Sequence, residues 1–148
     1  MKDFINYDSM LEVCMNLFTE VVEEFGYDKD SWDEEITVYA DICAQDAVDS
    51  MRKYVHRKDT RMCGNFCNIR EDWEYCPEFI GSEVKPWGRF DDVIKSIDDE
   101  TISDEDLAKF QTWTMDWYFT AFGTFGLKYN FGEMISEKAY EMEMEDAA

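Results

Sequence analysis

Apolar side chains recur at intervals of three and four residues along most of the chain, and this repeat constrains the fold more than any other feature. Such spacing places them on one face of an α-helix, which must be buried against another element. The first stripe consists of Leu11, Cys14, Phe18, Val21 and Phe25. Asp8 or Ser9 can cap this helix, and Gly26 follows it as a left-handed C-cap. We therefore expect a first helix that ends beside Gly26.

A second stripe accompanies a capping-box signature formed by Ser31 and Glu34. Its apolar members are Trp32, Ile36, Tyr39, Cys43, Ala47, Met51 and either Tyr54 or Val55. The repeat predicts a long helix that can reach His56. Because Cys14 and Cys43 lie on the apolar faces of these two helices, we expect both thiols in the core.

The second half of the chain has shorter helical repeats, separated by glycine and proline. A short helix is predicted by Phe90, Val93, Ile94 and Ile97. Ser103 and Asp106 resemble a capping box and mark the start of another helix. Its stripe includes Phe110, Trp113 and Trp117, and aromatic residues at helical spacing are more typical of a core than of a binding platform.

Near residues 124–131 the pattern becomes alternating. The apolar residues there are Phe125, Leu127, Tyr129 and Phe131. Alternation allows a short extended segment, and a last helix is expected from about Gly132. These elements predict a mainly α fold, a compact single-domain bundle of about five helices that covers residues 1–148, with a central loop at 56–76.

The chain is strongly acidic, with 35 Asp and Glu against 14 Lys and Arg and a net charge of −21. Phosphate backbones and anionic membrane surfaces would repel it, so neither nucleic acid nor a membrane is an expected partner. A basic protein groove would attract it and accelerate the encounter. The alternative is that the acidity only keeps the protein soluble.

The N-terminal segment has no basic region followed by an apolar run, so no signal peptide is predicted. The sequence also has no run of about 20 apolar residues that could span a bilayer. We therefore expect a cytoplasmic location. In a reducing cytoplasm, the five cysteines are expected to be thiols or metal ligands and not disulfides.

Four potential metal ligands are concentrated in the central loop. They are His56, Cys63, Cys67 and Cys76. Thiolate and imidazole suit Zn²⁺, and four such ligands complete a tetrahedral structural site. Neighbouring Arg and Lys would lower the thiol pKa values. The sequence thus predicts a structural zinc that clips the loop at 56–76, a polar loop without apolar anchors of its own.

The alternative to zinc is that the cysteines in this loop are small buried apolar residues and that His56 places its charge at a helix C-terminus.

The loop also begins in the only basic part of the chain. From Arg52 to Arg70 there are six basic residues and one acid, Asp59.

Catalytic motifs are missing from the sequence, so we expect that the protein is not an enzyme. A deaminase needs Glu two residues after its His, but Lys58 occupies that position. With one histidine, no HExxH is possible. No P-loop, GxSxG or GxGxxG occurs either.

Two acidic runs are candidate contacts for a basic partner. The first is a ladder at every fourth residue: Glu133, Glu137, Glu141 and Glu145. On a helix its members would stand about 6 Å apart along the axis, close to the spacing of phosphates along a strand. The second run is Asp98, Asp99, Glu100, Asp104, Glu105 and Asp106. Like charges four residues apart destabilise a helix unless a partner compensates them, although such runs also occur as solvated faces.

Small size, high acidity and the Cys/His cluster together resemble those of phage-encoded anti-CRISPR proteins, most of all a zinc-containing inhibitor of type II-A Cas9. The resemblance is one of character plus His56, Cys63, Cys67 and Cys76. It implies a protein that acts in the cytoplasm of a bacterial host cell. There it would bind Cas9, whose nucleic-acid channel is positively charged, and block the loading of target DNA.

Two other functions remain open. The protein could inhibit a restriction enzyme, or it could be a zinc-stabilised adaptor that does not mimic DNA. The salt dependence of partner binding distinguishes a mimic from an adaptor.

Overall fold

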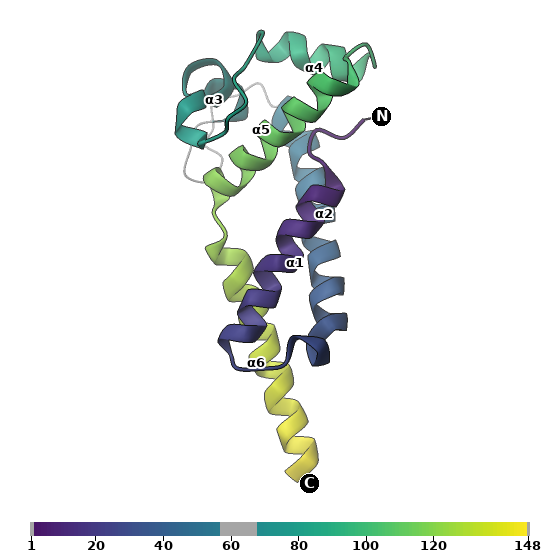
Figure 1. Cartoon of the computed structure of the whole chain (residues 1–148), viewed down its shortest axis with the longest axis vertical. Helices are drawn as coiled ribbons and strands as arrows, with labels where there is room; N and C mark the ends of the chain where they lie inside the picture. The colour runs from purple at the N-terminus through teal and green to yellow at the C-terminus, as the bar shows by residue number, and fades with distance from the viewer. Residues whose placement is uncertain (1, 57–67, 148) are drawn as a thin grey trace. The chain divides into compact units, whose positions relative to one another are not determined.

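The computed structural model describes residues 2–56 and 68–147 and consists of helices joined by loops (Figure 1). The α-helices are α1 (Tyr7–Glu24), α2 (Asp33–His56), α3 (Ile69–Tyr75), α4 (Phe90–Asp98), α5 (Asp104–Phe122) and α6 (Phe125–Ala147). Two short 3₁₀ helices are η1 (Lys29–Trp32) and η2 (Pro77–Ile80). The predicted mainly α fold is confirmed for the described residues, with six α-helices where about five were expected.

The chain divides into two compact units. Unit 1 comprises Met1–Met10 and Ala44–Gly123, and unit 2 comprises Leu11–Cys43 and Thr124–Ala148. The sequence analysis expected a single domain, and the division into two compact units does not test that prediction.

Unit 2 is built from most of α1, the first half of α2, and α6. Its core contains Phe18 stacked on Phe131, with ring centroids 4.4 Å apart, and Tyr39 lies 5.2 Å from Phe131. Lys138 of α6 donates a hydrogen bond to Glu35 of α2 at 2.7 Å. This bond holds the pKa of Glu35 below its ordinary value. One aromatic contact and one ion pair thus join α6 to α2.

The turn after α1 has the predicted glycine. Gly26 has φ +78°, a left-handed conformation that favours glycine because it has no Cβ. The backbone N–H of Tyr27 then donates to the carbonyl of Val22 at 3.1 Å, which satisfies a free carbonyl at the helix end. Tyr27 also stacks on Trp32 at 5.7 Å. The chain is therefore turned locally before α2 begins.

The structure corrects the expected extended segment near 124–131, since α6 already begins at Phe125. Alternating residues at 125, 127, 129 and 131 also fit a helix in which only some of them face the core. Phe131 is fully buried, whereas Phe125 and Tyr129 are 78% and 53% exposed. Packing of Phe131 against Phe18 selects the helix.

Unit 1 is organised around Trp73, which is 1% exposed. Its indole lies 4.9 Å from the ring of Trp113 and 5.5 Å from that of Phe110. The burial of Phe110, Trp113 and Trp117 confirms that the aromatic stripe of α5 belongs to a core.

Trp73 belongs to α3, a helix that the sequence analysis did not predict. That segment was expected to be part of a polar loop without apolar anchors. Instead, Ile69 and Trp73 are both buried. The expectation was wrong for residues 69–75, because this segment forms a seven-residue helix with two apolar side chains buried in the core.

Two expected N-terminal caps were also wrong, and one was correct. Asn6, and not Asp8 or Ser9, caps α1 by accepting from the backbone N–H of Ser9 at 3.0 Å. Asp28 caps η1, which precedes α2 where the Ser31 capping box was expected. Ser103 caps α5 as predicted, accepting from the N–H of Asp106 at 3.1 Å.

In residues 2–56 and 68–147, no helix combines the length and apolarity required to cross a membrane.

Candidate functional site

The glutamate ladder lies on α6, as the sequence predicted. Glu133, Glu137, Glu141 and Glu145 are all exposed. Buried Phe131 and Ile135 of the same helix face the core of unit 2, so the ladder occupies a different face from these two residues. From Tyr140 to Asp146 every residue is exposed, and α6 extends past the α1–α2 turn (Figure 1).

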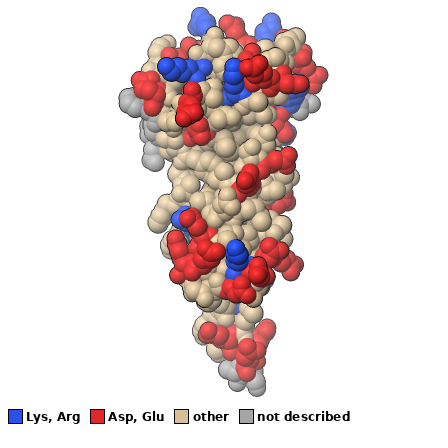
Figure 2. Space-filling model, viewed as in Figure 1, with Lys and Arg blue, Asp and Glu red and all other residues tan. Residues whose placement is uncertain are grey.

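Acidic charge is concentrated in unit 2. Its two segments, of 33 and 25 residues, contain 16 Asp and Glu and only three Lys and Arg, a charge of −13 out of −21. Unit 1 is larger and carries the remaining −8. Figure 2 shows acidic side chains along the C-terminal part of α6. Ala139–Asp146 contains four acids and no Lys or Arg.

The second acidic run spans the end of α4, the following loop and the first turn of α5. Three of its members have basic partners in unit 1. Asp98 accepts from His56, Asp104 lies 3.5 Å from the Lys2 Nζ, and Glu105 lies 3.2 Å from the Lys109 Nζ. Part of this run is therefore neutralised internally, which makes it a weaker candidate than the ladder for binding a basic partner.

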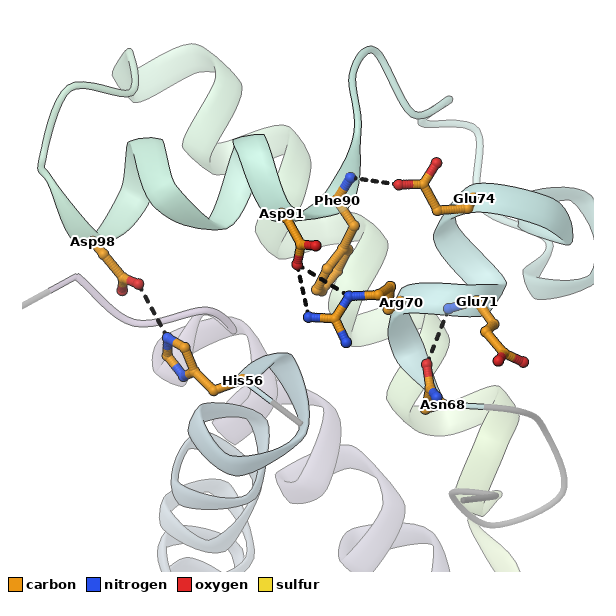
Figure 3. Close-up of polar contacts among 8 residues, drawn as sticks. All are labelled: His56, Asn68, Arg70, Glu71, Glu74, Phe90, Asp91 and Asp98. Atoms are coloured by element: carbon orange, nitrogen blue, oxygen red, sulfur yellow. Dashed lines mark hydrogen bonds and ion pairs between the residues drawn. The ribbon is translucent and has the colours of Figure 1, made fainter. Parts of the chain in front are cut away.

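His56 ends α2, and both of its ring nitrogens have an acceptor within hydrogen-bond distance. Figure 3 shows the contact with Asp98. Nδ1 lies 2.8 Å from the carbonyl of Arg52, and Nε2 lies 3.1 Å from the Asp98 carboxylate. Two acceptors suit a doubly protonated ring. A backbone carbonyl at Nδ1 is also the usual support for a histidine that binds metal through its other nitrogen. Zinc at Nε2 would take the place of the proton that faces Asp98.

The remaining predicted ligands are less closely defined. Cys63 and Cys67 lie outside the described residues. Cys76 caps the C-terminus of α3, where its N–H donates to the Asp72 carbonyl at 3.1 Å, and it is half-buried. Within 2–56 and 68–147, no three His, Cys, Asp or Glu side chains are placed to hold a metal. The zinc site stays a prediction.

Polar contacts fasten α3 to the start of α4 (Figure 3). Arg70 donates to one Asp91 oxygen from Nε at 3.0 Å and from Nη2 at 2.7 Å. Its guanidinium also lies 5.5 Å from the ring centroid of Phe90. Glu74 accepts from the backbone N–H of Phe90 at 2.8 Å, so an α3 side chain caps α4. Arg70 therefore joins α3 to α4, although the sequence analysis counted it only as part of a basic segment.

Cys14 and Cys43 are buried, as predicted. Burial, together with the nearby Cys43 thiol, raises the pKa of Cys14 to about 12. A thiol that remains protonated is a poor nucleophile and a poor metal ligand. The burial of both residues places them in the core.

Asp72 is a buried carboxyl that the sequence analysis missed. It is 2% exposed, and its Oδ2 accepts from the indole Nε1 of Trp117 at 2.7 Å. Burial raises the pKa of Asp72, although the Trp117 hydrogen bond partly opposes the rise. In a sequence with 35 acids, nothing marked this one as buried. Its contact with Trp117 identifies it as a link between α3 and α5.

Comparison with known proteins finds no family model, curated protein or solved structure that matches the chain.

Proposed function

We infer that the protein is a non-enzymatic inhibitor that binds a positively charged surface of a nucleic-acid-handling protein through its acidic unit 2. The observation that supports this proposal is the charge of −13 within unit 2, together with the exposed ladder on α6. An extended acidic surface increases the rate of encounter with a basic groove, and it competes with nucleic acid for the same Lys and Arg.

The geometry of the ladder is compatible with such competition. Its four carboxylates repeat at about 6 Å along a helix, so a groove that accommodates successive phosphates can meet successive carboxylates. Type II-A Cas9 is the first partner to test, because the resemblance to anti-CRISPR proteins implies it and because Cas9 holds nucleic acid in a positively charged channel. The proposed consequence is that target DNA is not loaded.

The test is reversal of the ladder to lysine at Glu133, Glu137, Glu141 and Glu145. Four reversals change the net charge from −21 to −13. If the ladder steers the encounter, association with purified Cas9 slows by roughly one to two orders of magnitude at low salt, and its dependence on ionic strength flattens. Stopped-flow association at two salt concentrations measures both effects.

A matched control separates local from global charge. Reversing four exposed acids of unit 1 produces the same change in net charge: Asp46, Glu78, Glu83 and Asp92. This control is expected to slow association less than the ladder variant does. If the folded ladder variant binds like the wild type at both salt concentrations, the ladder is only a solvated face and the proposed contact is wrong.

A further inference from the structure

A groove in unit 2 is lined mainly by aromatic rings and carboxylates. It has a volume of about 990 Å³ and lies between the C-terminal end of α1 and one face of α6. Phe25 comes from the α1 side, and Phe125, Tyr129 and Tyr140 come from α6. These four rings are 46%, 78%, 53% and 63% exposed, although aromatic residues normally bury most of their area in a fold of this size.

The walls of the groove are formed by regular structure. Phe125 and Tyr129 are four residues apart on α6, and their rings stack with centroids 5.8 Å apart. Gly132 forms part of the floor, because a Cβ there would lie 3.3 Å from the ring of Phe25. On the other wall, Phe25 stacks on Tyr27 at 6.0 Å. Three of the four exposed rings, those of Phe25, Phe125 and Tyr129, are thus each stacked on a neighbouring ring.

Charge selects what the groove would accept. Glu24, Glu133 and Glu137 line it, against one cation, Lys128. Lys128 is itself directed to α1, with its Nζ 3.7 Å from a Glu20 oxygen and 4.0 Å from a Glu24 oxygen. Glu133 and Glu137 thus supply negative charge beside Phe125 and Tyr129. Arginine suits this combination best, because its guanidinium stacks on aromatic faces and forms paired hydrogen bonds with carboxylates.

The length of the groove indicates a macromolecular ligand. Phe125 and Tyr140 are fifteen residues apart on α6, which corresponds to about 22 Å along the helix axis. This length is much greater than the diameter of a small cation, and it equals about four turns of a second helix. The lining residues of α6 recur at three- and four-residue intervals, the spacing by which one helix packs against another. A helix in the groove would be the fourth of unit 2.

We propose that this groove binds an amphipathic helix of the partner protein that carries arginine beside its apolar face. The proposal rests on the proposed function, since it identifies the kind of segment in a basic partner that unit 2 would recognise. Apolar residues of the helix would cover Phe25 and Phe125. Its arginines would reach Glu133 and Glu137 across the ring of Tyr129.

The probe is a fluorescent synthetic 15-residue helix with leucine along one face and arginine on both flanks. Anisotropy should show binding to the wild-type chain. Tyr129→Ala and Phe125→Ala should each weaken the affinity about tenfold, as truncation of a central aromatic contact does. Tyr75→Ala is the matched control, because Tyr75 is a 77% exposed aromatic residue of unit 1. It should leave the affinity unchanged.

Charge is tested in the same assay. Glu133→Gln with Glu137→Gln should weaken binding of the arginine helix, whereas Glu143→Gln with Asp146→Asn, outside both the groove and the ladder on the same helix, should change it much less. A peptide with lysine in place of arginine should bind more weakly at equal charge. Circular dichroism of each variant establishes that α6 is intact.

Several results would overturn the inference. One is equal affinity of the aromatic variants and the wild type. Another is undiminished binding of a peptide whose leucines are serine, which would reduce the contact to charge alone. A third is that light scattering finds the wild-type chain as a dimer and the Tyr129→Ala variant as a monomer. A second copy of the chain would then be what covers the groove. Cas9 binding that is unaffected by Tyr129→Ala and Phe125→Ala would leave the proposed function standing and reject only this site. Peptide binding without any Cas9 binding would reject Cas9 as the partner and retain the groove.

Discussion

Replacing Trp73 by alanine is expected to lower the free energy of unfolding of unit 1 by about 4 kcal/mol. The indole is 1% exposed and lies within 6.1 Å, centroid to centroid, of the rings of Trp87, Phe90, Phe110 and Trp113. Removing such a side chain loses its burial and leaves a cavity between α3, α4 and α5.

The size of the effect follows from burial and not from the hydrogen bond that Trp73 makes. Truncation of a fully buried Phe or Trp typically costs about 3–5 kcal/mol. The indole N–H of Trp73 donates to the carbonyl of Gly88 at 2.8 Å, but Gly88 is exposed, so water can replace that donor at little cost. Because a typical domain is stable by only about 5–15 kcal/mol, the variant should lose between about a quarter and four fifths of its stability.

Urea titration followed by far-ultraviolet circular dichroism measures the change. With a slope of about 2 kcal/mol per molar urea, the midpoint should fall by about 2 M. Trp87→Ala is the matched control, because Trp87 contacts Trp73 but is 41% exposed. It should cost about 1 kcal/mol, the contribution of one aromatic pair.

This reasoning fails if Trp73→Ala is within about 1 kcal/mol of the wild type. The segment 69–75 would then be anchored by something other than its apolar side chains. If a chelator unfolded the same protein, a metal in the preceding segment would be that anchor.

Two further predictions concern a buried acid and the proposed metal. Burial raises the pKa of Asp72 above its ordinary value of 3.8, so its ionised form costs stability as the pH rises through the folded-state pKa. Asp72→Asn retains an acceptor for Trp117 and should raise the thermal midpoint at neutral pH. The gain should vanish below pH 3.8, and the exposed Asp46→Asn should show neither effect. For the metal, elemental analysis of protein purified without added zinc should find about one ion per chain, and Cys63→Ser should lower both zinc content and thermal midpoint. Zinc content near zero together with full stability in chelator would exclude the site.

Local patterns in the sequence were sufficient for α1, α2, α4 and α5. In each, most of the apolar residues that recur every three or four positions are buried in the structure, because a helix places them on one face wherever it lies. Phe25 is an exception in the first stripe, since α1 ends at Glu24 and the Phe25 side chain is 46% exposed. The cap at Ser103 and the left-handed Gly26 were also predictable, since both depend on neighbours within a few residues.

Only the tertiary structure decided α3 and the start of α6. The seven residues of α3 are too few to show a helical period, and Trp73 is buried because α5 supplies the surface that covers it. Residues 125–131 fit both a strand and a helix. The contact between Phe131 and Phe18, more than a hundred residues apart in sequence, selects the helix and leaves Phe125 and Tyr129 exposed.

The candidate site likewise depends partly on the order of residues in the chain and partly on packing between distant segments. Sequence alone establishes the net charge of −21 and the four-residue interval of the ladder, because both are properties of the chain order. It could not divide that charge between the units, since 11–43 and 124–148 form one unit only after folding. Nor could it place Glu133 and Glu137 in the same groove as Phe25, because that groove depends on α1 and α6 packing together. Spacing along the chain determines which residues share a helix face, whereas packing between distant segments determines what that face meets.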